Sequence, residues 1–128
     1  MLPDGQTGAT LPVADIDRAR KFYSETLGFS VATESPGGIL FGSGKGTAFF
    51  VYPSEFAGTN KATAMTVNVD DFDAEIAALR EKGITFLDFD YGEFKTENGV
   101  AQTPDGPGAW FSDPDGNIIA LAQMPPVS

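Results

Sequence analysis

The chain has 128 residues, which is the size of one domain and is enough to bury a sizeable core. It carries eighteen acidic and eight basic residues, a formal net charge of −10, and it contains no cysteine and no histidine. This charge disfavours a nucleic acid or an anionic membrane as partner. The two missing residue types exclude disulfides, thiolate and imidazole metal ligands, and a Ser-His-Asp triad. We see no signal peptide and no apolar run of about 18 residues, so we expect a cytoplasmic protein with no membrane span.

The first half of the chain predicts a strand, a helix and three more strands. Residues 8–13 favour a strand, and Asp15 can then cap a helix over residues 16–27, where apolar residues recur at helical spacing. Gly28 suits the end of this helix because glycine tolerates positive φ. The next strands are expected at 29–33, 39–42 and 47–52, with a linker at 53–62.

The second half predicts the same order of elements. The pattern indicates a strand at 64–69, a helix at 71–82, a strand at 84–89, a long polar loop at 90–108, and a hairpin of 109–111 with 118–123. The hairpin turn is Ser-Asp-Pro-Asp-Gly-Asn, in which proline suits the second turn position and glycine the left-handed one. Twelve of the eighteen acidic residues lie in residues 63–128.

The two halves form an internal repeat. Val13-Ala-Asp-Ile-Asp in the first half matches Val69-Asp-Asp-Phe-Asp in the second. A strand-helix-strand-strand-strand unit therefore occurs twice, which predicts an α+β fold whose helices cover one face of each sheet. Side-chain alternation along the first strands assigns residues to faces. Leu11, Val13, Val67 and Val69 should be buried under the helices, with Thr10, Pro12, Thr66 and Asn68 on the opposite faces. Two such faces curled together would enclose a groove, and the alternative is that they are only solvated.

Three stretches together resemble one protein family. Residues 11–29 (LPVADIDRARKFYSETLGF), 69–84 and 110–123 (WFSDPDGNIIALAQ) resemble the glyoxalase, bleomycin-resistance and extradiol-dioxygenase superfamily, also called vicinal oxygen chelate proteins. The resemblance implies one domain over 1–128, built from two paired βαβββ modules whose eight strands form an incomplete barrel around a cavity. Module one would span about 6–53, the linker about 53–62 and module two about 63–125. Members of this family form homodimers, so the resemblance also implies a homodimer.

The resemblance locates four positions at which the family's enzymes hold a divalent metal. Matched residue by residue, they are Gly8, Ala64, Ala120 and Ala48, the last placed by aligning Pro53 with Pro125. None of these side chains offers a nitrogen or oxygen donor, which a divalent metal requires. We therefore expect no metal and no cofactor, an enlarged cavity, and no metal-dependent glyoxalase or dioxygenase activity.

A groove lined by aromatic and polar residues remains as the candidate site. Strand alternation points Phe50 and Tyr52 to the same side as Ala48, and Trp110 is a further wall residue, although Phe50 and Trp110 could equally be core. Residues 88–97 interleave four acids with three aromatic residues; this composition suits a cationic or planar ligand, but an exposed acidic loop is the favoured interpretation. The candidate ligand-binding residues are Thr10, Ala48, Phe50, Tyr52, Ala64, Thr66, Asn68, Asp90, Glu93, Trp110 and Ala120.

Three functions are compatible with these residues. The first is a metal-free binding protein, similar to the bleomycin-resistance type, that sequesters a cationic or aromatic small molecule; the acidic charge would raise the local concentration of a cation. The second is a metal-independent lyase, isomerase or hydrolase that uses carboxylates such as Glu55, Asp88, Asp90 and Glu93, or Tyr52. The third is a scaffold that acts through protein contacts.

Overall fold

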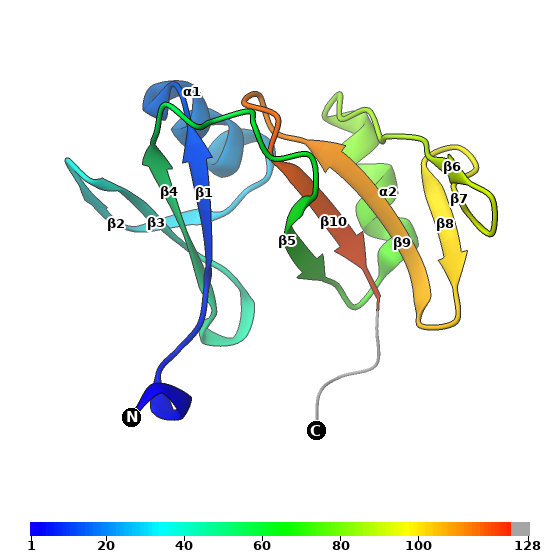
Figure 1. Cartoon of the computed structure of the whole chain (residues 1–128), viewed down its shortest axis with the longest axis horizontal. Coiled ribbons are helices and arrows are strands. Elements are labelled where there is room, and N and C mark those ends of the chain that lie inside the picture. Colours follow the sequence, from blue (N-terminus) through cyan, green and yellow to red (C-terminus); the bar gives the residue numbers. More distant parts are fainter. Residues whose placement is uncertain (124–128) are drawn as a thin grey trace.

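A computed structural model describes residues 1–123, which form two four-stranded sheets, each with one helix against one face (Figure 1). The sheets do not close on each other, so the predicted α+β fold with an incomplete barrel is confirmed. Pro125, used above to place Ala48, and the expected end of module two lie outside the described residues. Among residues 1–123, no helix has the length and apolar character needed to cross a bilayer.

Module one has the predicted elements. They are β1 (Ala9–Val13), α1 (Ile16–Lys21), which continues as a π-helical stretch (Phe22–Thr26), β2 (Ser30–Ser35), β3 (Gly38–Gly42) and β4 (Ala48–Pro53). Short 3-10 turns at Leu2–Asp4 and Gly44–Gly46 complete this half. Asp15 caps α1 as expected, because its carboxylate accepts hydrogen bonds from the backbone N–H groups of Asp17 and Arg18. The strand order is β1-β4-β3-β2, with β1 parallel to β4.

Module two repeats this order with one insertion. Its elements are β5 (Thr63–Asn68), α2 (Phe72–Glu81), β6 (Asp90–Tyr91), β7 (Phe94–Lys95), β8 (Val100–Thr103), β9 (Gly106–Ser112) and β10 (Ile118–Ala122). The sheet order β5-β10-β9-β8, with β5 parallel to β10, matches that of module one. The β6–β7 hairpin is the insertion, and it lies between α2 and β8.

Two predictions for module two are wrong. Residues 84–89 are extended but form no strand; one backbone bond, from Leu87 N–H to Trp110 O at 2.8 Å, links them to β9. The place beside β9 is taken by β8, which pairs with it from Val100 to Thr103. The expected long polar loop at 90–108 therefore contains β6, β7, β8 and the start of β9.

The hydrophobic core lies between the sheets and the helices and contains residues of both modules. Leu11 and Val13 are fully buried as predicted. Val67 and Val69 are only half-buried, less than predicted, although both pack against the core. Thr10, Thr66 and Asn68 are exposed, in agreement with their assignment to the opposite faces.

The turn between β9 and β10 binds module two to module one, and we call this contact the clasp. Figure 1 shows this turn beside α1. Asp113 is buried and its carboxylate accepts four hydrogen bonds, from Tyr23 Oη (2.7 Å), Asn117 Nδ2 (2.8 Å) and the backbone N–H groups of Asp115 (2.9 Å) and Asn117 (2.8 Å). Asn117 Nδ2 also donates to Pro12 O of β1 at 2.8 Å.

The second carboxylate of the clasp reaches α1. Asp115 Oδ1 accepts hydrogen bonds from Ala14 N at 2.9 Å and from Arg18 Nη2 at 2.7 Å. The Asp115 side chain is 2% exposed and that of Arg18 is 48% exposed, so the ion pair lies at the margin of the core. Burial, with the Asp113 carboxylate next to it, raises the pKa of Tyr23 above its ordinary value. The clasp therefore ties the two modules together through a network of buried polar groups.

Candidate functional site

The face of the second sheet opposite α2 holds a pocket of about 330 Å³. Three of its lining residues lie side by side on this face, because Ala120 of β10 pairs with Thr66 of β5 and with Trp110 of β9. The full lining is Thr63, Thr66, Phe94, Thr103, Asp105, Gly106, Pro107, Gly108, Trp110, Ala120, Leu121 and Ala122. An apolar floor with a few polar groups is typical of a small-molecule site.

An aromatic wall stands on one side of the pocket, built from β9 and the β6–β7 hairpin. We call residues 90–95 the aromatic hairpin. The Phe94 ring packs edge-on against Trp110 with centroids 5.4 Å apart, and Phe89 does the same at 5.8 Å. Tyr91 stacks on Phe89 at 6.0 Å and on Phe94 at 6.3 Å, and it remains 73% exposed. The aromatic wall therefore extends from the half-buried indole of Trp110 to the exposed ring of Tyr91.

Glycine makes room for the indole of Trp110. Gly108 lies two residues before Trp110 on the same face of β9, and a Cβ on Gly108 would come 3.1 Å from the Trp110 ring. That distance is tighter than ordinary van der Waals contact, so glycine lets the indole lie along the strand. The polar groups of the lining include Asp105 at the β8–β9 turn and Thr103, whose hydroxyl donates to Gly106 O at 2.7 Å.

The structure separates the predicted site residues into four sets. Thr66, Trp110 and Ala120 line the pocket on the second sheet. Ala64 and Asn68 are on β5 but are not in the lining. The first-sheet group, Thr10, Ala48, Phe50 and Tyr52, lies on the strands β1 and β4, where Phe50 and Tyr52 stack at 6.3 Å. Asp90 and Glu93 are exposed on the aromatic hairpin.

Phe94, Thr103 and Asp105 also line the pocket, and the sequence reasoning did not name them as site residues. All three lie in residues 90–108, which were expected to be a loop. For Phe94 a signal was present in the segment 88–97, where three aromatic residues flank a glycine at a turn position. If this segment had been predicted to be a hairpin, its aromatic residues would have been expected to pack against the neighbouring β9.

The positions at which family enzymes hold a metal do not fit one here. Gly8, Ala48, Ala64 and Ala120 have no side-chain donor atoms, and divalent metals need several. A Cβ on Gly8 would lie 2.8 Å from Ala48 O, so a larger residue there would require the backbone to move. Within residues 1–123, no three Asp or Glu side chains gather closely enough to hold an ion.

The carboxylates considered for catalysis do not line the pocket, and two of them accept local hydrogen bonds. Hydrogen bonds from the Thr96 hydroxyl and from the backbone N–H of Gly99 lower the pKa of Asp88. Asp90 accepts a hydrogen bond from the N–H of Gly92 inside the hairpin turn. Glu55 is exposed in the linker. The pocket lining therefore brings no pair of carboxylates together.

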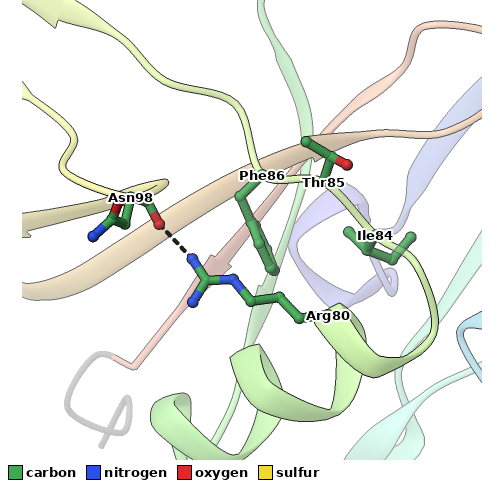
Figure 2. Close-up of a pocket in the computed structure, with 5 residues that line it drawn as sticks. All are labelled: Arg80, Ile84, Thr85, Phe86 and Asn98. Carbon is green, nitrogen blue, oxygen red and sulfur yellow. Dashed lines mark hydrogen bonds between the residues drawn. The ribbon is translucent and has the colours of Figure 1, made fainter.

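A second hollow, of about 450 Å³, lies between the end of α2 and the extended residues that follow it. Figure 2 shows its lining, in which Arg80 reaches from α2 to the backbone carbonyl of Asn98. The guanidinium also lies over the ring of Phe86, 5.5 Å from its centroid. Arg80 is thus already engaged by groups of the protein on two sides.

Comparison with known proteins agrees with this architecture. An antibiotic-binding protein, TnmS3 from Streptomyces sp. CB03234, is similar at 28% identity with a TM-score of 0.69, over 95% of this chain and 98% of that one. A glyoxalase/bleomycin resistance protein from the same organism is similar at 30% identity with a TM-score of 0.63, over 91% and 100%. A bleomycin resistance determinant encoded on transposon Tn5 shares the fold, with 21% identity, a TM-score of 0.72 and coverage of 94% and 98%.

No curated protein matches this chain. The family model that does match is the Glyoxalase/Bleomycin resistance protein/Dioxygenase superfamily, over residues 6–121. That match covers nearly all of both sheets and both helices, from before β1 into β10. The chain therefore belongs to the glyoxalase/bleomycin resistance protein/dioxygenase superfamily.

Proposed function

We propose that this protein binds a small molecule that carries a planar aromatic group, and that it sequesters this ligand without converting it. The observation that carries the proposal is the pocket on the second sheet, where the aromatic wall of Trp110 and Phe94 faces a floor of small residues. Ala120 lies in that floor, at a position where the family's enzymes place a metal ligand. A methyl group at this position leaves space for a ligand in place of a metal.

The relatives support a binding role. TnmS3, which is 28% identical over 95% of this chain, is an antibiotic-binding protein. Offset stacking and edge-on contacts between aromatic rings contribute about 0.5–1.5 kcal/mol beyond the burial of their area. A ligand ring placed between Tyr91, Phe94 and Trp110 would gain such contacts.

A positive charge on the ligand would suit the surroundings of the pocket. Asp105 is part of the lining, and Asp90 and Glu93 lie on the exposed hairpin next to it. With a net charge of −10, the protein attracts cations from solution, and this attraction is screened over roughly 10 Å at 0.1 M salt. We therefore expect planar cations to bind more tightly than planar anions of similar size.

The catalytic alternative has less support, because no pair of carboxylates lines the pocket. A general acid and a general base must both lie within hydrogen-bond reach of the same substrate. Asp105 is the one acidic residue of the pocket lining. Turnover of a panel of small metabolites would contradict the binding role.

A ligand panel tests the proposal directly. Bleomycin and the planar cation proflavine are expected to raise the melting temperature, because a ligand at about 100 times its Kd adds about 2.7 kcal/mol to the stability of the folded state. The planar anion anthraquinone-2-sulfonate serves as the matched control and is expected to have no effect. Affinities from calorimetry should fall as salt is added. Equal binding of the anion would show that the acidic charge only solvates the surface, and no shift with any planar probe would contradict the binding role.

We also predict that the protein is isolated without a stoichiometric metal. Elemental analysis of protein purified without chelators is expected to find far less than one Zn, Ni, Fe or Mn per chain, and EDTA should leave the melting temperature unchanged. The reason is the lack of donor atoms at Gly8, Ala48, Ala64 and Ala120. About one metal per chain would mean that carboxylates and backbone carbonyls elsewhere bind it.

We further propose that the protein is a homodimer in the cytoplasm with no nucleic-acid partner. The stacked Phe50 and Tyr52 on the first sheet, with exposed Thr10 next to them, offer a surface on which a second copy could pack. Sedimentation velocity is expected to give twice the 13.5 kDa mass of the chain. A single species at the mass of one chain would contradict the dimer, and retention on a DNA column would contradict the absence of a nucleic-acid partner.

A further inference from the structure

The segment between α2 and β8 wraps round one edge of the second sheet. Trp110 and Phe111 are consecutive in β9, so their side chains point to opposite faces. Phe86 packs against Phe111 on the helix side, with centroids 5.9 Å apart, whereas Phe89 and Phe94 pack against Trp110 on the pocket side. The chain therefore crosses from one face to the other between residues 86 and 89.

The crossing is fixed at the edge of the sheet by the backbone bond from Leu87 N–H to Trp110 O, at 2.8 Å. The hairpin beyond it has little support of its own. Its two strands pair over only two residues each, and all its residues are exposed, Phe94 by 38%. An isolated two-stranded hairpin of this kind is at best marginally stable in water. Contacts at its base must hold it over the pocket.

One set of base contacts comes from α2. Arg80 donates a hydrogen bond to the backbone carbonyl of Asn98, on the chain returning from the hairpin, and covers the ring of Phe86 on the outgoing chain (Figure 2). We call the parts of the segment that lead to and from the hairpin its two legs. The legs are in close contact here, because a Cβ on Gly99 would lie 2.5 Å from the Cβ of Phe86. Gly99 has φ +79°, a conformation that also favours glycine. Arg80 thus joins both legs of the segment to the helix.

The other set comes from Asp88. Its Oδ1 accepts a hydrogen bond from the Thr96 hydroxyl at 2.7 Å and one from the N–H of Gly99 at 2.8 Å. The backbone N–H of Phe89 donates to the Thr96 hydroxyl oxygen at 2.8 Å, and Thr96 N–H donates to Phe89 O at 2.9 Å. These bonds cross between the two legs directly below the hairpin. The pKa of Asp88 is lowered by the two hydrogen bonds it accepts, which is consistent with an ionised carboxylate at this point.

We propose that Arg80 and Asp88 are positioning residues for the ligand pocket: from the base of the segment they hold the aromatic hairpin at the height at which Phe94 packs over Trp110. The hollow in Figure 2 is then the place where the two legs meet α2, and it is not a separate ligand site, because the guanidinium of Arg80 already contacts Asn98 and Phe86. The inference rests on the proposed function only in that the pocket takes a ligand.

The chain carries its own reporter, since Trp110 is its only tryptophan and is the residue that the hairpin covers. In Arg80→Ala, we expect Trp110 emission to shift to the red and its acrylamide quenching constant to rise about twofold, because the hairpin opens locally while the core stays folded. The matched control is Lys82→Ala, which removes the same charge from an exposed residue at the same end of α2 and should leave both signals unchanged.

A pair of variants at Asp88 separates positioning from a general structural role. Asp88→Ala removes the acceptor and should reproduce the Arg80→Ala signals, with the urea midpoint of global unfolding unchanged. Asp88→Asn keeps an acceptor oxygen for Thr96 and Gly99 and should restore the wild-type emission. Unchanged quenching in both Arg80→Ala and Asp88→Ala overturns the proposal, as does a lowered urea midpoint with unchanged quenching.

Ligand measurements on the same variants distinguish the two proposals. If proflavine binds the wild type, its affinity should fall about fivefold or more in Arg80→Ala and should not change in Lys82→Ala. Unchanged proflavine affinity with raised quenching would show that the hairpin does not shape the pocket, which overturns the positioning role. If no ligand binds the wild type but the quenching results hold, the positioning of the hairpin over Trp110 stands and the proposed function fails.

Discussion

Replacing Asp113 by asparagine is expected to lower the free energy of unfolding by about 3 kcal/mol. The Asp113 carboxylate accepts four hydrogen bonds in the clasp, from Tyr23, Asn117 (twice) and Asp115. An asparagine would place its NH2 group against two of these donors, so at least one buried N–H group would lose its acceptor. Urea unfolding followed by circular dichroism measures the loss.

The matched control for the clasp is Asp70→Asn, which makes the same change of charge at an exposed residue and should have an effect within about 0.5 kcal/mol. Tyr23→Phe should fall between the two variants, at about 1–2 kcal/mol, because one hydrogen bond is lost and the ring remains. A loss below about 1 kcal/mol in Asp113→Asn would show that the clasp contributes little to stability.

The clasp also predicts how stability depends on alkaline pH. The pKa of Tyr23 is raised in the folded protein above the ordinary value of 10.0. Above about pH 10 the unfolded chain loses this proton while the folded protein keeps it, so the stabilising contribution of Tyr23 declines as the pH rises further. Tyr23→Phe should lack this part of the decline. An identical alkaline profile in the wild type and in Tyr23→Phe would contradict the buried hydrogen bond.

Trp110→Ala is expected to weaken ligand binding by about 1–3 kcal/mol, or roughly 5- to 150-fold in Kd, through lost ring contacts and lost burial of apolar area. Calorimetry with the probe that stabilises the wild type measures the change, and the melting temperature checks that the variant is folded. Trp110→Phe keeps a ring at this position and should recover most of the affinity. Binding unchanged in Trp110→Ala would place the ligand outside the pocket on the second sheet.

Tyr52→Ala is the control for the other sheet. Tyr52 lies on β4 and is not part of the pocket lining, so its loss should change Kd by less than about twofold. A weakening as large as that in Trp110→Ala would mean that the first sheet also meets the ligand. In a homodimer this would require the first sheet of one copy to face the pocket of the other.

Much of the fold could be predicted because its signals are local. The N-caps of the two helices are Asp15 and Asp71, whose carboxylates accept hydrogen bonds from the first turn, and the cap at Asp15 was predicted from the sequence. Burial of Leu11 and Val13 followed from strand alternation in the same way. The repeat predicted that the same order of elements occurs twice along the chain, and the two sheets have the same strand order.

The errors in module two arise because local patterns do not specify a partner. Residues 84–89 are rich in β-branched and aromatic residues, as a strand would be, but this segment wraps an edge, with Phe86 against Phe111 and Phe89 against Trp110. Strand β8 was missed because Val100–Thr103 is short and contains polar residues, and because glycine and proline follow it at 106–108. Only the tertiary structure shows that β8 and not 84–89 fills the place beside β9.

The candidate site was predictable where it lies on regular strands. Thr66, Trp110 and Ala120 were named from alternation and from the family resemblance, and all three line the pocket. Phe94 was missed because it lies in the inserted hairpin, which has no counterpart in module one, and Asp105 was missed because the β8–β9 turn was expected to be part of a long loop. Insertions carry no register from the repeat, so their side chains cannot be assigned to a face in this way.

The hairpin insertion also bears on how such a scaffold acquires new ligands during evolution. The two modules share their strand order, and only the second carries the β6–β7 insertion. None of its residues, 90–95, is buried, so substitutions or changes of length there leave the hydrophobic core intact. The duplicated sheets preserve folding while this short hairpin varies, so one wall of the pocket can change without redesign of the core.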